Sequence, residues 1–437
     1  MKHWGLLIFA VIFSLNSWSD ERKLLETKTL RVGAEQVEAY LPLLKGKRVG
    51  LIANQTSVAF NVDLHLLDLL MSHNVNVTHV FAPEHGVRGD HSDGETVESS
   101  VDSKTGIPLV SIYGKNKRPP AQIIAQLDVI VYDIQDVGAR FYTYINSMFY
   151  MMQAAQQQGI PFIVLDRPNP HLQKVDGPML DPEFRSFVGL LPLPMVYGLT
   201  VGELAQMIVG EDWLNTIQPL PNNAKLKPLE LTVIPVKHYS RSDSYDLPIP
   251  PSPNLPNAKA VALYPSLVLF EATTVSIGRG TQHPFQLVGH PKLFIGDFIF
   301  TPRSIPGVSK YPKWENTLLT GTYLSVEYHE ESGVTNTELD LSILHQWSQL
   351  FKPKVSTLPN SNASESANKS ANNSSAEIKR SRQYTFIDRP DFFDKLAGTN
   401  QFRADLQSGK SIKEIKRQWQ AGLNQFLLDR QPYLIYP

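Results

Sequence analysis

The stretch that decides the fold is Val80–Asp90, VFAPEHGVRGD, in which an apolar run stops abruptly at a Glu-His-Gly turn. Upstream of it, Lys47–Ala53 has the pattern of a buried strand and Asn61 is placed to cap a helix. Val75–Ala82 then has the pattern of a second strand. Strand, helix and strand predict one βαβ unit, with Glu84 at the tip of its second strand.

The same alternation continues downstream. Leu109–Tyr113, Val129–Tyr132 and Phe162–Leu165 have strand patterns, and Arg140–Gln158 has the apolar period of a helix that Gly159 is positioned to stop. Strands that alternate with helices at this spacing predict an α/β fold. We expect a Rossmann-like parallel sheet with helices on both faces.

Polar side chains follow four of the predicted strands. They are Asn54 with Gln55, Glu84 with His85, Asp133 with Asp136, and Asp166 with Arg167. Ligands bind at the carboxyl ends of the strands in parallel sheets of this kind. The sequence therefore predicts one site at this edge of the sheet.

A carboxyl group at the end of a buried strand can sit in a partly dry pocket, where it becomes a proton donor. Glu84 fits this description, although it could equally cap a turn or pair with Arg88. Asp133 and Asp136 are candidates for a second carboxyl group, since glycoside hydrolases generally use two. Asp136 is the weaker candidate, because capping a helix that begins near Gly138 explains it as well.

Arginine and tyrosine side chains near these strand ends could bind a substrate. Arg140, Arg167 and Arg279 are candidates for holding an anionic group, because a guanidinium matches a carboxylate in two hydrogen bonds. Each could instead tie loops together. Tyr142 and Tyr113 could stack on a sugar.

The length of 437 residues predicts two domains, which we place at residues 21–195 and 196–437. The second is expected to be a smaller α+β domain. Its signals are capping boxes at Thr200–Glu203 and Ser411–Glu414, a strand at Leu231–Val236, a stiff Pro-rich segment at Leu247–Pro256, and a strand with a tight loop at Phe270–Thr281. Residues 355–377 are almost entirely polar, and we expect a disordered insertion there.

Residues 1–20 have the pattern of a secretory signal peptide, with a Lys near the start, an apolar block at Leu6–Leu15, and small residues at Ser17 and Ser19. No later segment has the ~20 apolar residues that a membrane-spanning helix needs. The absence of cysteine suits an oxidising compartment. We therefore expect export across the inner membrane, to the periplasm, without stable membrane insertion afterwards.

Charge and motifs exclude several classes of function. The 41 Lys and Arg residues are balanced by 42 Asp and Glu residues, so the chain lacks the excess positive charge that is typical of nucleic-acid-binding proteins. The sequence has no strand-GxGxxG-helix arrangement, Walker motif, GxSxG elbow or HExxH. We expect no cofactor and no metal, which leaves cofactor-free hydrolysis or binding.

Several long motifs carry a resemblance to a known family. FAPEHGVRGD, VYDIQDVGARFYTYI, VLDRPNP, PPSPNLP and FEATTVSIGRGT resemble the exo-β-N-acetylmuramidase family, from about Arg48 to the final RQPYLIYP. The resemblance implies a glycoside hydrolase that releases terminal N-acetylmuramic acid from the non-reducing ends of peptidoglycan fragments. It also implies a cleft between a Rossmann-like domain and a smaller one, with Glu84 as the catalytic acid.

This substrate gives the other candidates a role. The lactyl carboxylate would meet an arginine, and the acetamido group would meet Asn54, Gln55 or Asn169. Asp133 is the expected second carboxyl group. Two alternatives remain, a non-catalytic muropeptide-binding protein and a metal-dependent hydrolase.

Overall fold

The computed structural model describes residues 29–84, 86–89, 100–114, 117–219, 226–293, 295–324, 338–351 and 385–437. The predicted signal peptide at residues 1–20, the predicted insertion at 355–377, and His85 lie outside these ranges.

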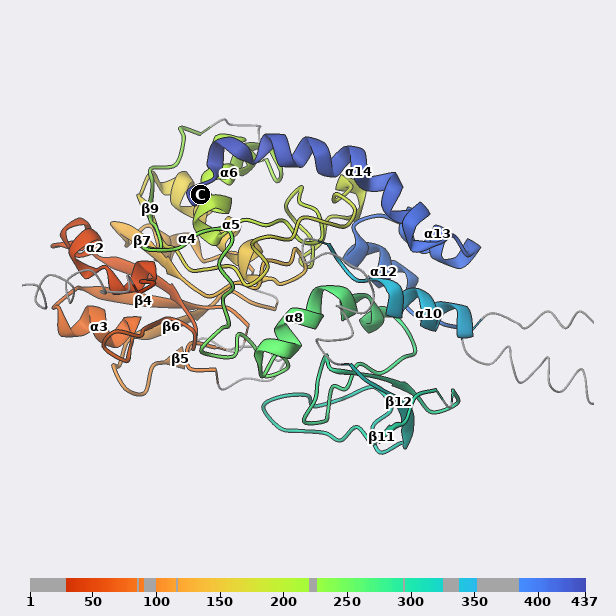
Figure 1. The fold of residues 1–437 in the computed structure, drawn as a ribbon. Coiled ribbons are helices and arrows are strands. Elements are labelled where there is room, and N and C mark those ends of the chain that lie inside the picture. Colours follow the sequence, from red (N-terminus) through yellow and green to blue (C-terminus); the bar gives the residue numbers. More distant parts are fainter. Residues whose placement is uncertain are drawn as a thin grey trace, which may run out of the picture.

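A seven-stranded, mostly parallel sheet organises the first half of the chain (Figure 1). Its strands, in spatial order, are β5 (Ser100–Val101), β6 (Pro108–Ser111), β4 (Val77–Ala82), β1 (Val49–Ala53), β7 (Val129–Asp133), β8 (Phe162–Leu165) and β9 (Leu231–Ile234). Only β5 runs antiparallel to its neighbour. The predicted α/β class with a parallel sheet is thus confirmed. The division at residue 195 stays a prediction, but β9, which lies beyond it, belongs to this sheet.

Each face of the sheet packs into its own hydrophobic core, because successive side chains of a strand point to opposite faces. On β1, Leu51 packs into one core and Ile52 into the other. The first core is covered by α2 (Val37–Leu44) and α3 (Leu66–Ser72). The second is covered by α4 (Ala121–Ile124), α5 (Tyr144–Gln158) and α6 (Val201–Gly210), with α7 (Trp213–Thr216) beside them. Burial on both faces explains why these strands are almost continuously apolar.

Local signals set several of the helix ends. Gly159 ends α5 with a left-handed φ of 65°, as predicted. Asn61 was wrong as the cap of α3, because it lies in the turn of a small hairpin formed by β2 (Val58–Ala59) and β3 (Leu64–His65), and α3 begins only after β3. The His65 side chain caps α3 instead, accepting a hydrogen bond from the backbone N–H of Leu67.

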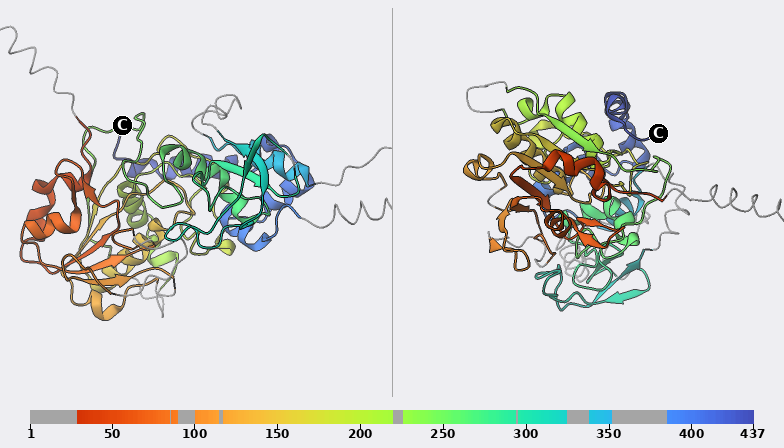
Figure 2. Two further views of the ribbon diagram at one scale, coloured as in Figure 1. Left: turned by 90° about the horizontal axis from the view of Figure 1, so that it is seen from below. Right: turned by 90° about the vertical axis from the view of Figure 1, so that its left-hand side faces the viewer.

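The C-terminal half combines helices with a small antiparallel sheet, at the opposite end of the molecule from α2 and α3 (Figure 2). The sheet order is β10 (Leu287–His290), β12 (Leu319–Tyr323), β11 (Phe298–Phe300). The helices are α8 (Ala258–Leu267), η4 (Val268–Ala272), α10 (Ser342–Leu350), α12 (Pro390–Ala397), α13 (Gln401–Ser408) and α14 (Ile412–Asp429). The predicted strand at Phe270–Thr281 was wrong, because η4 begins this segment. Gly278 and Gly280 nonetheless have the positive φ of a tight loop.

The two halves share one hydrophobic core. The core that contains α5 continues through α10, α12 and α13 to α14, whose Trp419 and Phe426 are buried. The capping boxes of α6 and α14 are both present.

Near the C-terminus, the Tyr436 hydroxyl donates to Asp166 Oδ2 at 2.5 Å, and the Ile435 N–H donates to Glu203 Oε1 at 2.9 Å. These contacts hold residues 435 and 436 against α6 and the end of β8. In the described residues, no helix is both long enough and apolar enough to cross a bilayer.

Candidate active site

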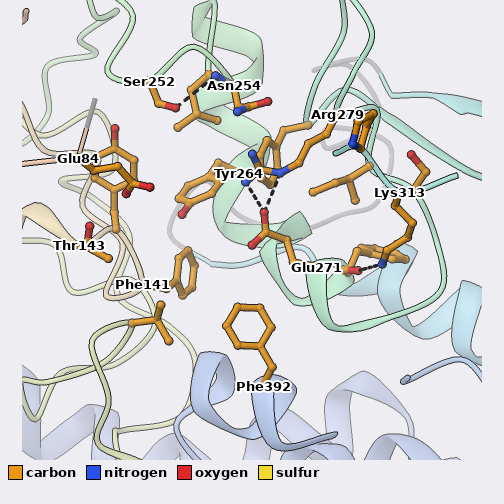
Figure 3. A pocket seen from close by; sticks show the side chains of 18 of the residues that line it. Glu84, Phe141, Thr143, Ser252, Asn254, Tyr264, Glu271, Arg279, Lys313 and Phe392 are labelled. Atoms are coloured by element: carbon orange, nitrogen blue, oxygen red, sulfur yellow. Dashed lines mark hydrogen bonds and ion pairs between the residues drawn. The ribbon is translucent and has the colours of Figure 1, made fainter. Parts of the chain in front are cut away.

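A cavity of about 620 Å³ lies where loops from the strand ends meet the C-terminal half (Figure 3). One side carries Glu84, which follows β4, and Tyr142, which precedes α5. The other carries Glu271 on η4, with Arg279 and Lys313 from the loops beyond it. The cavity is therefore built by residues from both halves of the chain.

Glu84 is partly exposed in this cavity. The Tyr113 hydroxyl donates a hydrogen bond to Glu84 Oε1 at 2.6 Å. Tyr113 follows β6, and β6 pairs in parallel with β4, so adjacent strand ends bring the phenol to the carboxyl group. A carboxyl group that is oriented by a neighbour and open to a ligand is suited to donate a proton to it.

The Pro-rich segment, Leu247–Pro256, packs against residues that follow the strands. The Tyr142 hydroxyl donates to the Pro251 carbonyl at 2.8 Å, and Gln55 Nε2 donates to the Pro250 and Pro251 carbonyls at 3.2 and 3.1 Å. Asn254, at the end of this segment, lines the cavity. Gln55 and Tyr142 thus both bind the Pro-rich segment, and of the two only Tyr142 also lines the cavity.

Four charged residues form the wall opposite Glu84, and we call Glu271, Arg279, Lys313 and Arg389 the charged wall. Arg279 donates from Nε to Glu271 Oε1 at 2.9 Å, with Nη2 on the same oxygen. Arg389 donates to the backbone carbonyl of Glu271.

Lys313 donates from Nζ to the carbonyls of Phe270 and Val275, at 3.5 and 3.4 Å, and to that of Thr273. Burial lowers the Lys313 pKa to about 8. The amino group therefore fixes the turn that follows Glu271 while its charge lies under the cavity surface.

Asp133 is paired with Arg167 instead of facing the cavity. The Arg167 Nε–Asp133 Oδ1 distance is 2.6 Å, the Nη2–Oδ2 distance is 2.9 Å, and the side chains are 1% and 0% exposed. Neither lines the cavity. The charges of Asp133 and Arg167, at the ends of the neighbouring strands β7 and β8, thus neutralise each other.

Asp136 and Asp166 are also buried and occupied by internal donors. Asp136 accepts from the Gly138 N–H at 2.7 Å and from the Tyr197 hydroxyl. Asp166 accepts from Thr200, Gly202 and Tyr436. Burial raises the pKa of both carboxyl groups to about 6.

The other predicted residues lie outside the cavity. Arg140 is fully buried and donates to four backbone carbonyls, those of Pro178, Leu193, Leu396 and Ala397. Arg88 lies between Asp102 and Asp68, in ion pairs. Asn54 accepts from Thr56, and Asn169 bridges the Leu199 carbonyl and the His171 N–H. His85 is outside the described residues.

The cavity therefore brings together Glu84, Tyr113, Tyr142 and Arg279 from the residues named as candidates in the sequence. Sequence reasoning missed Glu271, Lys313 and Arg389, and it did not foresee the bond from Tyr113 to Glu84. Glu271 was within reach, because it stands in the FEATTVSIGRGT motif beside Arg279. Lys313 and Arg389 stand in stretches with no chemical motif of their own.

Comparisons with known proteins cover almost the whole chain. Residues 49–259 match the family model described as Exo-beta-N-acetylmuramidase NamZ, N-terminal, and residues 262–436 match its C-terminal counterpart. The peptidoglycan beta-N-acetylmuramidase NamZ of Bacillus subtilis is 34% identical over 449 residues, covering 99% of this chain and 98% of that protein.

Two crystal structures of DUF1343 family proteins from Bacteroides fragilis have similar folds. One is 40% identical with a TM-score of 0.75, and the other is 28% identical with a TM-score of 0.72. Each comparison covers 93% of this chain and 99% of the other.

Proposed function

Because this chain belongs to the exo-beta-N-acetylmuramidase NamZ family, we propose that it releases N-acetylmuramic acid from the non-reducing ends of peptidoglycan fragments. It is a glycoside hydrolase by this membership. The observation that carries the proposal is Glu84, held by Tyr113 and open to a cavity of about 620 Å³. Ligand pockets typically measure roughly 300–1,000 Å³, so the cavity can hold a sugar.

In the proposed reaction, the Glu84 carboxyl donates its proton to the glycosidic oxygen as the bond from that oxygen to the sugar breaks. Water supplies the new hydroxyl group. Tyr113 orients the carboxyl group, and Tyr142 offers an aromatic surface beside it. Proton transfer from a positioned group of this kind contributes roughly 10²–10⁴-fold to a rate.

The second carboxyl group stays a prediction. Asp133 was expected in that role, and its ion pair with Arg167 does not support it. Among the described residues that line the cavity, the acids are Glu84 and Glu271. Variants of Asp133 test the expected role directly.

We also propose that the substrates are muropeptides and related sugars and that the protein works in the periplasm. The support for this location is the pattern of residues 1–20 and the absence of cysteine. Cell fractionation and N-terminal sequencing of the exported protein test it. A protein that stays in the cytoplasm with residues 1–20 attached would contradict it.

The test of the function is turnover of a chromogenic N-acetylmuramide. Wild type is expected to release the chromophore, and Glu84→Gln to lose at least about a hundredfold in kcat. Glu38→Gln is the matched control, because Glu38 is exposed on α2 at the far side of the sheet. Binding without release would favour the muropeptide-binding alternative, and inhibition by a chelator would favour a metal-dependent hydrolase.

A further inference from the structure

The loop that connects β11 to β12 brings one exposed aromatic side chain to the cavity. We call this loop, residues 301–318, the rim loop. Its Tyr311 lines the cavity and is also 82% exposed, so this side chain lies at the mouth of the cavity. Single exposed apolar side chains are common on protein surfaces, and exposure alone says little. The position of Tyr311 at the mouth is what points to a ligand.

The rim loop is anchored on the N-terminal side of Tyr311. The Ser304 hydroxyl donates to the carbonyl of Lys310, the residue directly before Tyr311, at 2.8 Å. Asn254 Nδ2, from the Pro-rich segment, donates to the Val308 carbonyl at 2.9 Å. The first part of the rim loop is therefore bound both to itself and to a neighbouring segment that lines the same cavity.

The loop is also anchored on the C-terminal side of Tyr311. Pro312 is buried and packs against Gly280, so closely that a Cβ added to this glycine would lie 2.6 Å from the proline ring. Trp314 Nε1 donates to the Thr274 carbonyl at 2.7 Å. Because Tyr311 precedes a proline, its own backbone is restricted to extended conformations.

The backbone on both sides of Tyr311 is thus fixed, while its ring stays in solvent. Lys310 Nζ lies 5.6 Å from the ring centre, and the exposure of 82% leaves most of the ring open to a ligand. A ligand that covers this ring does not have to order the loop first, which lowers the entropic cost of binding. Tyrosine suits such a contact because it offers a large, rigid apolar surface with a polar tip.

The proposed reaction supplies a ligand for this position. Glu84 protonates the oxygen that joins the terminal sugar to the rest of the fragment, and the cavity encloses that terminal sugar. The next sugar of the fragment therefore extends toward the mouth of the cavity. The C–H groups on the face of a sugar ring can pack against an aromatic ring while the hydroxyl groups at its edge stay in water.

We propose that Tyr311 stacks on the sugar that follows the cleaved bond and makes the enzyme prefer fragments of at least two sugars. Tyr311 is a specificity-determining residue in this scheme and takes no part in proton transfer. The inference rests on the proposed function. It goes further by assigning a binding position for the part of the substrate that is released with the new hydroxyl group.

The first test measures ligand binding to the Glu84→Gln protein by calorimetry. The ligands are N-acetylmuramic acid, which has one ring, and the disaccharide in which it is β-linked to N-acetylglucosamine. Tyr311→Ala in this background should weaken binding of the disaccharide about tenfold, the value of one apolar ring contact, and change binding of the single sugar less than about twofold. Tyr311→Phe should bind both ligands as the parent protein does, because the ring makes the contact.

The second test measures release of N-acetylmuramic acid from the disaccharide by the otherwise unchanged enzyme. Tyr311→Ala should raise KM about tenfold and leave kcat within about twofold. Ile299→Ala is the matched control, because Ile299 on β11 is an apolar side chain of similar exposure, 62%, outside the cavity lining. This control should keep wild-type KM and kcat.

Several outcomes would overturn the inference. Equal weakening of both ligands by Tyr311→Ala would place Tyr311 on the terminal sugar, and unchanged binding of both would show that it contacts neither. A loss in Tyr311→Phe as large as that in Tyr311→Ala would exclude stacking as the contact.

The two tests also separate the inference from the proposed function. If wild type does not cleave the disaccharide but binds it in a manner that depends on Tyr311, the proposed function alone is refuted. If wild type cleaves the disaccharide and Tyr311→Ala does so with unchanged KM, the inference alone is refuted.

Discussion

Replacing Asp133 with Asn should destabilise the protein strongly and leave the chemistry of the folded protein intact. The variant removes the negative charge that compensates Arg167 while both side chains stay buried, at 0% and 1% exposure. Two unit charges at about 4 Å interact by roughly 4 kcal/mol at an effective dielectric constant of ~20. Breaking a buried ion pair by removing one partner costs about 3–5 kcal/mol, which agrees.

The assay is urea unfolding of wild type, Asp133→Asn, Arg167→Met and the double variant. We expect each single variant to lose about 3–5 kcal/mol of unfolding free energy. The double variant should lose less than the sum of the two, because no unpaired charge remains in it. Turnover, measured at a temperature at which every variant is folded, should fall much less than for Glu84→Gln.

The opposite pattern would refute this reasoning. If Asp133→Asn keeps wild-type stability and loses about a hundredfold or more in kcat, Asp133 acts on the substrate. The buried ion pair would then not describe the working state of the enzyme, and the predicted second carboxyl group would stand.

Three further predictions follow from single contacts. Tyr113→Phe removes the hydrogen bond to Glu84 and should lower kcat by about tenfold, with unchanged urea stability as the check on folding. Asp136→Asn should flatten the pH dependence of the unfolding free energy. Burial raises the Asp136 pKa from 3.8 to about 6. The protonated carboxyl group therefore contributes fully to stability below pH ~4, and this contribution, about 3 kcal/mol, is lost as pH rises through about 6. Urea unfolding at pH 4.5 and 7 should show about 2 kcal/mol of this change, and an equal pH dependence in both proteins would contradict it. Arg140→Met leaves four buried carbonyls without their donor and should cost roughly 3 kcal/mol or more, with little change in kcat per folded molecule.

Much of the sheet could be predicted from sequence, because its strands are buried on both faces and therefore almost wholly apolar. Phe162–Leu165 is a strand with the predicted bounds, and Gly159 ends the helix before it. The capping boxes at Thr200 and Ser411 were also reliable, because their hydrogen bonds join residues three positions apart. Asn61 failed as a cap because it lies in the turn of the β2–β3 hairpin, and a cap signal alone does not reveal such a hairpin.

The site was harder to predict because polar residues at strand ends can satisfy one another. Asp133 and Arg167 looked as suitable for a ligand as Glu84 did, and they pair with each other across neighbouring strands. Which strand-end group faces the cavity depends on the residues that form the other side of the cavity. Lys313 and Arg389 on that side come from distant segments of the chain, and no local sequence pattern marks them. A sequence pattern predicts which polar residues follow the strands, at the carboxyl edge of the sheet, but it does not predict the direction in which each side chain points.

The contact between Tyr436 and Asp166 has a consequence for how the protein is made. The two residues are 270 positions apart. Asp166, which directly follows β8, is therefore synthesised long before the Tyr436 hydroxyl that donates to its side chain. Contacts of such high sequence separation form late and slow folding, because a long loop must close before they form. The contact at the end of β8 therefore forms as a late event, and a nascent chain released before residue 436 would lack this donor to Asp166.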